Sequence, residues 1–129
     1  MKRREEGSVT AFITALLGVF VVVAGLTVDG GRLVAVRIEM LDHAENAARV
    51  AVQNVTSLRS GVPRVDVDRA RSAAEHYLRQ HGVSGGVDAT PETVTVRVSR
   101  AVPLTILSVI GLGSRLISVE RSATPIPGP

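Results

Sequence analysis

The chain has 129 residues, a formal net charge of +3, and only 2% aromatic residues, with no Trp. A chain of this length has room for one small domain, and its composition gives no basis for predicting a base-stacking surface or a basic nucleic-acid stripe. The absence of Cys removes disulfides, thiolate nucleophiles and thiolate metal sites.

The first predicted element is a transmembrane helix from Ser8 to Val28. This apolar run carries no charged side chain, and about 20 apolar residues at 1.5 Å each cross the roughly 30 Å hydrocarbon core of a bilayer. Because Lys2, Arg3 and Arg4 precede the run, the positive-inside rule predicts a cytoplasmic N-terminus and an extracytoplasmic remainder, in a single pass. The alternative is a cleaved secretory signal peptide, but the run is longer than the roughly 7 to 15 apolar residues of such a segment.

A polar boundary follows the apolar run. We expect it to form a membrane-exit motif made of four residues, Asp29, Gly30, Gly31 and Arg32. Asp29 either simply ends the lipid-buried section or pairs with Arg32 or with a basic side chain of a partner. Within the run, Gly18 and Gly25 offer a surface on which a second helix can pack closely.

The region after Gly31 is predicted to continue as a helix. Its apolar residues recur every three or four positions, as on one helix face: Leu33, Val36, Met40, Ala44, Ala47, Ala51, Val55 and Leu58. If the Gly pair at 30–31 does not break it, one helix runs from about Val9 to Leu58, and Gly61 with Pro63 provides the stop.

A second helix and several strands follow. Asp66 is the expected N-cap of the helix, and Gly82 is its expected end. The other elements are a loop at 84–86, a short strand at 87–89, a turn at 90–92, a strand at 93–98, a helix at 104–112 that is buried on the sheet or rests on the membrane surface, and a strand at 116–123. This order predicts an α+β fold in which the long N-terminal transmembrane helix continues into a small domain, whose helices pack on one face of an antiparallel sheet of about three strands.

The expected organisation has five parts. They are a cytoplasmic basic leader at 1–7, the transmembrane helix at 8–28, its extramembrane continuation at 29–60, a small α+β domain at 61–124, and a disordered tail at 125–129.

Patterns typical of enzymes are missing from the sequence. His43, His76 and His81 lie far apart in the sequence or five apart on a helix, so a shared metal ion is not expected. No His-Glu-x-x-His pair, Gly-x-Ser-x-Gly elbow or phosphate loop occurs. We therefore predict no catalytic residue, no metal, no cofactor and no small-molecule substrate.

Three segments of the N-terminal half carry a family resemblance. Gly7 to Phe12 (GSVTAF), Val28 to Arg32 (VDGGR) and Ala44 to Ala51 (AENAARVA) resemble the TadE/TadG-like proteins of Tad (Flp) pilus systems, closely over about the first 55 residues. The resemblance implies a pilin-like, membrane-anchored component of pilus assembly or secretion, whose partners are the membrane and other pilus or secretion-system subunits. The alternative is an extracytoplasmic binding or sensor module unrelated to pili.

The resemblance also implies a processing site. In pilin-like relatives a peptidase cuts after a Gly that follows basic residues, which here corresponds to the bond between Gly7 and Ser8. Such relatives carry a Glu five positions after the cut, whereas this chain has Phe12 there. That departure favours the retained-anchor, TadG-like end of the family over a major pilin.

Overall fold

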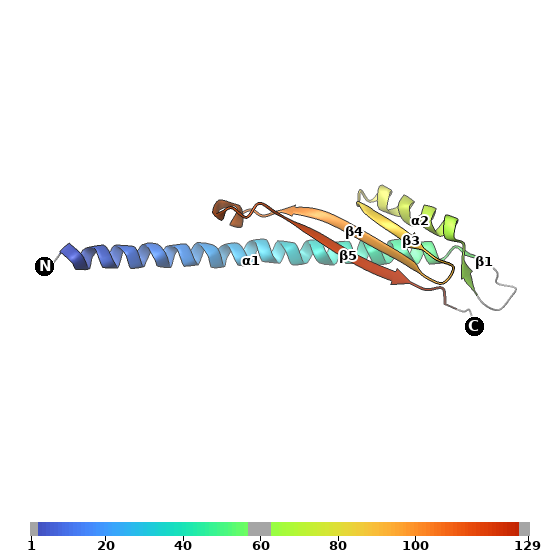
Figure 1. The fold of residues 1–129 in the computed structure, drawn as a ribbon, viewed down its shortest axis with the longest axis horizontal. Coiled ribbons are helices and arrows are strands. Elements are labelled where there is room, and N and C mark those ends of the chain that lie inside the picture. The colour runs from blue at the N-terminus through green and yellow to red at the C-terminus, as the bar shows by residue number, and fades with distance from the viewer. Residues whose placement is uncertain (1–2, 57–62, 127–129) are drawn as a thin grey trace. The chain divides into compact units, whose positions relative to one another are not determined.

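The computed structural model of the protein describes residues 3–56 and 63–126. Its elements in chain order are helix α1 (Arg3–Val52), strands β1 (Val55–Thr56) and β2 (Arg64–Val65), helix α2 (Val67–Gln80), strands β3 (Gly85–Ala89) and β4 (Val94–Pro103), the short 3-10 helix η2 (Leu107–Ile110) and strand β5 (Ser114–Ala123) (Figure 1). They form two compact units, residues 1–34 with 102–115 and residues 35–101 with 116–129.

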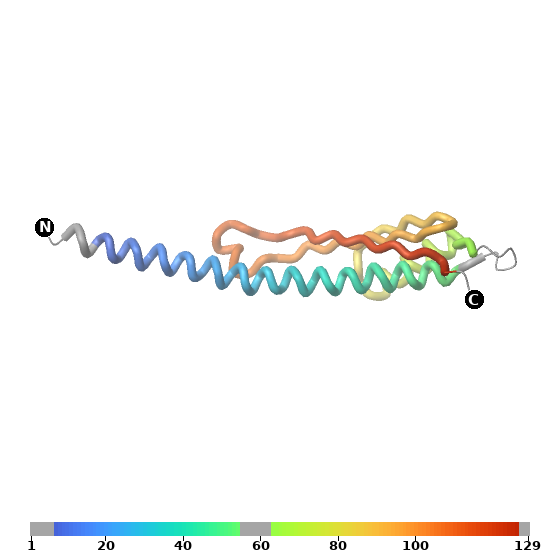
Figure 2. The backbone as a smooth tube through the Cα atoms, turned by 90° about the horizontal axis from the view of Figure 1, so that it is seen from below, coloured from blue at the N-terminus to red at the C-terminus, as the bar shows by residue number. Residues whose placement is uncertain are grey.

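Helix α1 is continuous through the Gly pair at 30–31, as Figure 2 shows. The sequence predicts helix as far as Leu58, but α1 ends at Val52, and Leu58 lies outside the described residues. The earlier end has a local cause, because the side-chain amide of Asn54 donates to the carbonyl of Val50 at 3.2 Å. That bond satisfies one of the free carbonyls of the last turn, which is how an Asn closes a helix.

Helix α2 begins and ends where the sequence predicts. The carboxylate of Asp66 accepts the backbone N–H of Arg69 at 3.2 Å, so Asp66 is the N-cap. Gly82 follows the helix with φ +63°, a left-handed conformation that favours glycine. The short strands β1 and β2, which the sequence did not predict, pair antiparallel just before α2. The predicted stop at Gly61 lies between them, outside the described residues.

The sheet has the strand order β3-β4-β5 and is antiparallel. Strands β3 and β4 form a hairpin in which Ala89 lies opposite Val94, which confirms the turn predicted around Pro91. That turn is closed by the backbone N–H of Thr90, which donates to the carbonyl of Thr93 at 2.8 Å. Strand β4 is longer than the predicted strand at 93–98.

Helices α1 and α2 share one core with the sheet in the unit formed by residues 35–101 and 116–129. Val94, Val96 and Val98 alternate along β4 and are fully buried, so one face of the strand points inward. The helices contribute Met40, Ala44, Ala47 and Ala51 from α1 and Ala70, Ala74 and Leu78 from α2. Because both helices bury residues of the same strand face, the α+β fold with helices on one face of the sheet is confirmed.

Gly85 and Gly86 belong to strand β3, so the prediction of a loop at 84–86 is wrong at these two residues. A Cβ atom at Gly85 would lie 2.5 Å from the carbonyl oxygen of Arg97. Only glycine allows the two strands to approach each other this closely, and the requirement comes from the neighbouring strand rather than from the local sequence.

The predicted helix at 104–112 is also wrong. The segment is instead the tip of the β4–β5 hairpin and holds only the four-residue 3-10 helix η2. Gly111, at φ +89°, ends η2 in a left-handed conformation, and the backbone N–H of Leu104 donates to the carbonyl of Gly113 at 2.9 Å. Strand pairing at the two ends of the segment therefore determines its structure, and the apolar run is too short to form an independent helix against it.

Candidate functional site

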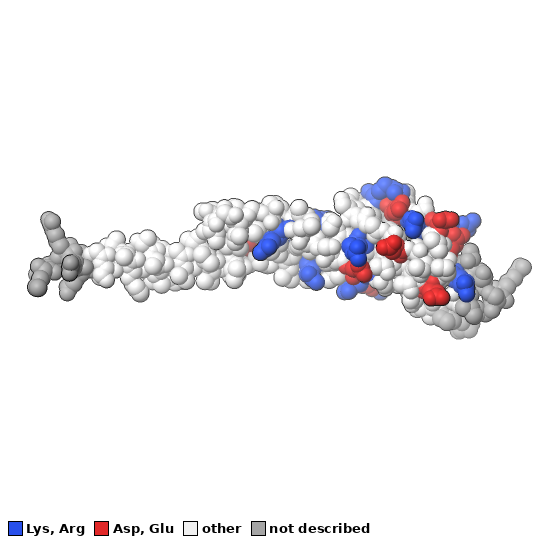
Figure 3. Space-filling model, viewed as in Figure 1, with Lys and Arg blue, Asp and Glu red and all other residues white. Residues whose placement is uncertain are grey.

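In the unit formed by residues 1–34 and 102–115, the apolar run of α1 at 8–28 forms an exposed surface. Its large side chains are exposed: 68% for Phe12, 58% for Val19 and 64% for Phe20. Figure 3 shows uninterrupted uncharged surface along this part of α1, while charged side chains gather over α2 and the strands. In the described part of the chain, α1 is the one helix that is long and apolar enough to cross a bilayer.

Two of the polar side chains inside this run, Thr14 and Thr27, bond to their own helix. The hydroxyls of Thr14 and Thr27 each donate at 2.9 Å to the backbone carbonyl four residues earlier, those of Thr10 and Val23. A threonine paired in this way presents its methyl group outward and no free donor. The run therefore suits a medium that offers no hydrogen-bond partners.

Asp29 is a buried charged residue of this unit, with 1% of its surface exposed. Its carboxylate accepts three backbone N–H groups from the hairpin tip, those of Thr105 at 2.9 Å, Ile106 at 2.9 Å and Leu107 at 2.8 Å. Asp29 follows the apolar run and lies outside it. The bond from Leu107, with those from the other two amides and the nearby Arg32 charge, lowers the pKa of Asp29 below its usual value, against an opposing effect of burial.

Two further contacts connect the hairpin tip to α1. A Cβ atom at Gly25 would lie 2.9 Å from Cδ2 of Leu107 and 3.0 Å from Cγ2 of Ile106, so the glycine lets the tip approach the helix closely. The guanidinium of Arg32 donates to the hydroxyl of Thr105 at 3.4 Å. The close-packing surface expected at Gly25 thus receives a segment of the same chain.

The other predicted site residues lie in α1 without such contacts. Gly7 and Ser8 are both helical, and Ser8 is exposed. A Cβ atom at Gly30 or at Gly31 would meet nothing within 4 Å, so neither glycine is required by a close approach in this unit. The role of Asp29 as a cap for the hairpin tip was missed, because its partners lie 76 to 78 positions later in the chain. The sequence carries no signal that joins them.

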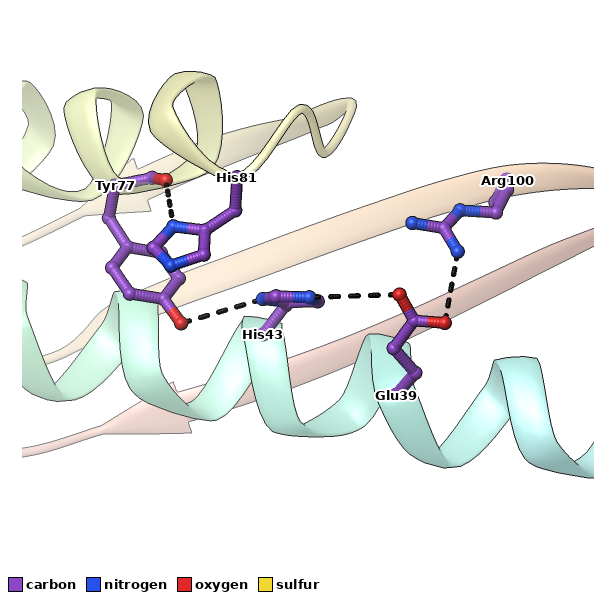
Figure 4. Close-up of polar contacts among 5 residues, drawn as sticks. All are labelled: Glu39, His43, Tyr77, His81 and Arg100. Carbon is purple, nitrogen blue, oxygen red and sulfur yellow. Dashed lines mark hydrogen bonds and ion pairs between the residues drawn. The ribbon is translucent and has the colours of Figure 1, made fainter.

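A polar cluster lies in the other unit, where α1, α2 and β4 meet (Figure 4). The carboxylate of Glu39 lies 3.1 Å from the guanidinium of Arg100 and 3.9 Å from Nε2 of His43. Nδ1 of His43 lies 3.4 Å from the hydroxyl of Tyr77. The ring of His81 stacks on Tyr77 with 4.1 Å between centroids, and its Nδ1 donates to the carbonyl of Tyr77 at 2.8 Å.

The cluster contains two histidines, His43 and His81, that are far apart in the sequence. The rings of His43 and His81 lie 5.3 Å apart, whereas His76 is exposed on α2. Among residues 7–54 and 63–126 no group of three His, Cys, Asp or Glu side chains is arranged to hold a metal ion. The contacts made by the cluster fasten α1 to α2 and to β4.

Comparison with known proteins gives one result. Residues 7–54 match the family model described as Flp pilus-assembly TadE/G-like. Over these residues the chain is similar to the TadE/G-like family. No curated protein and no solved structure matches the chain.

The TadE/G-like segment holds the features that the sequence singled out. It includes Gly7 and Ser8, the apolar run, the four residues from Asp29 to Arg32, and the buried face of α1, which ends at Val52. The match confirms the resemblance drawn from the N-terminal half. TadE/G-like proteins belong to Flp pilus assembly and are generally not catalytic.

Proposed function

We propose that the protein is a membrane-anchored, pilin-like component of Tad (Flp) pilus-assembly or secretion machinery, which acts through protein–protein contacts rather than bond chemistry. The observation that carries the proposal is that one unbroken helix, α1, joins an exposed apolar run to a buried face in the folded α+β unit. The same helix is the part of the chain that matches the TadE/G-like family. Its partners are the membrane and other pilus or secretion-system subunits.

The proposed orientation follows from the charges at the start of the chain. Lys2, Arg3 and Arg4 precede the apolar run, and the positive-inside rule keeps such a segment in the cytoplasm. The chain then crosses the cell membrane once, and its α+β part is extracytoplasmic. The proposed leader is 1–7 and the proposed span is 8–28, while the extramembrane continuation of the helix ends at Val52.

Whether a prepilin-type peptidase processes the chain is a separate question about Gly7 and Ser8. Without a Glu at the position of Phe12, a new N-terminal amine would lack the carboxylate partner that pilin-like subunits supply within lipid. We therefore propose that the anchor is retained. Intact mass measurement of the protein extracted from its native membrane decides the point, since loss of the first seven residues would show that the cut occurs.

The test of the function uses a deletion strain complemented with variants of the gene. Val19 and Ile38 form a matched pair on α1, because both are branched apolar residues and their exposed fractions are 58% and 55%. Val19→Asp places a charge near the middle of the span, at a cost of about 3 kcal/mol on insertion scales. Ile38→Asp places the same charge on the extracytoplasmic part, where water solvates it.

We expect the deletion strain to lose surface pili, and we expect the wild-type and Ile38→Asp genes to restore them. The Val19→Asp protein should be depleted from the membrane fraction and should fail to restore pili. If the deletion strain keeps its pili, although the wild-type protein is found in the membrane of the complemented strain, the pilus role is wrong and the binding or sensor module is favoured. If Val19→Asp protein remains fully in the membrane, the proposed span is wrong.

A further inference from the structure

The tip of the β4–β5 hairpin lies beside the apolar run of α1, within one compact unit. Leu107 packs against Gly25, and further along Ile110 lines a shallow groove together with Val19. Val19 precedes Asp29 by ten residues, which is roughly 15 Å of helix, or half the thickness of a hydrocarbon core. If the run spans the bilayer, the hairpin tip lies at the same depth as its outer half.

The composition of the hairpin tip suits that position. No residue from Ala101 to Ser114 is charged, while Arg100 and Arg115 stand at the two ends of this stretch. Three apolar side chains near its middle are exposed, with exposed fractions of 81% for Val109, 55% for Ile110 and 45% for Leu112. A monomer in water gains nothing by exposing such side chains together, whereas acyl chains would cover them.

Many polar groups of the tip form hydrogen bonds within the chain. Irregular backbone is excluded from lipid because unpaired N–H and C=O groups are costly there. The carboxylate of Asp29 accepts hydrogen bonds from the three backbone N–H groups at residues 105–107. Backbone carbonyls of the tip accept four more hydrogen bonds, from the N–H groups of Leu104, Val109, Gly111 and Leu112. The hydroxyl of Ser108 donates to the carbonyl of Thr105 at 2.7 Å.

We propose that residues 104–113 form a second membrane-inserted element, a hairpin tip that lies among the acyl chains of the outer leaflet against α1. This inference rests on the proposed function, because it requires the run at 8–28 to span the bilayer. The surface of Val109 and Ile110 is covered by lipid, and Arg100 and Arg115 mark where the chain enters and leaves the headgroup layer. The protein is then held in the membrane at two places rather than one.

The experiment measures depth in a bilayer with the full chain. Because the chain has no Cys, single substitutions accept one fluorescent label each, at Val109→Cys in the tip, Phe20→Cys in the span and Ser84→Cys in the loop before β3. All three side chains are exposed, so the labels need no space in the core. Each labelled protein is reconstituted at high lipid excess into phosphatidylethanolamine–phosphatidylglycerol vesicles. Quenching is then measured with lipids spin-labelled on the acyl chain and with iodide in the water.

We expect the Val109 label to behave like the Phe20 label, with strong quenching by the spin-labelled lipids and several-fold less quenching by iodide than at Ser84. If iodide quenches Val109 as it quenches Ser84 while Phe20 stays protected, the inserted tip is wrong and the anchor stands. If iodide also quenches Phe20, the anchor itself is wrong. If Val109 is protected from both quenchers, a second copy of the chain covers it, and insertion into lipid is again wrong.

Discussion

Replacing Asp29 removes the acceptor that holds the hairpin tip to α1. In Asp29→Ala, the backbone N–H groups of residues 105–107 lose the acceptor that the carboxylate supplied. In Asp29→Asn, one side-chain oxygen remains. It can keep the two amides of Ile106 and Leu107, which share one carboxylate oxygen, while the new NH2 group faces the N–H of Thr105.

The expected size of the effect follows from the bonds that are lost. A hydrogen bond to a charged acceptor changes an opening equilibrium by roughly ten- to a hundredfold. Since one charged acceptor serves three amides, we expect residues 105–107 of Asp29→Ala to exchange their amide hydrogens at least about a hundredfold faster. Asp29→Asn should lie between this variant and the wild type, with Thr105 the most affected amide.

The assay is hydrogen–deuterium exchange on the full-length protein in detergent micelles at constant pH. Glu45→Gln is the matched control, because Glu45 is a carboxylate on the same helix that pairs with Arg49 at an exposed site. This control should leave the exchange of residues 105–107 unchanged. Equal exchange rates in wild type and Asp29→Ala would refute the assigned role of Asp29.

Three further predictions concern Gly25, Met40 and the pH dependence of the Asp29 contact. Gly25→Val should push the tip away from α1 and speed amide exchange at residues 106–107. Gly18→Val should not, because a Cβ atom at Gly18 would meet nothing within 4 Å. Equal exchange rates in the two variants would contradict the close contact at Gly25. Met40→Ala should lower the free energy of unfolding of the α+β unit by about 2–5 kcal/mol in denaturant titration, because Met40 is fully buried. Ile38→Ala, at an exposed site, should change it by less than about 0.5 kcal/mol. The pKa of Asp29 is lowered in the folded state, so the stabilisation that Asp29 gives to the tip should be fully present above about pH 4 and be lost as the pH falls further. Amide NMR signals of the tip that shift near neutral pH would contradict this prediction.

The helices could be predicted from the sequence because their signals are local. The periodicity that includes Met40 and the N-cap at Asp66 both lie within a few residues of what they determine. The alternation around Val96 likewise identifies β4 and its buried face. The end of α1 was misplaced because the apolar spacing continues past it, whereas side-chain bonds from Asn54 to the carbonyls of the last turn end the helix.

The remaining features depend on residues that are distant in sequence. The local sequence predicts a loop at Gly85, and only the structure shows that the carbonyl of Arg97 lies beside it. The apolar stretch at 104–112 has the composition of a short helix, and only the pairing of its flanking strands makes it a hairpin tip. The sequence indicates only that Asp29 ends a span, because it does not show which backbone N–H groups donate to the carboxylate. The contact between the tip and α1 is therefore a result of the structure.

The central prediction is that α1 crosses the membrane and that the α+β part lies outside the cytoplasm. The most direct measurement labels single cysteines with a membrane-impermeant maleimide in intact spheroplasts of the native host. We predict that Ser84→Cys reacts with intact spheroplasts, and that Phe20→Cys reacts only after detergent is added. Reaction of Ser84→Cys only after lysis, or ready reaction of Phe20→Cys without detergent, would contradict the account.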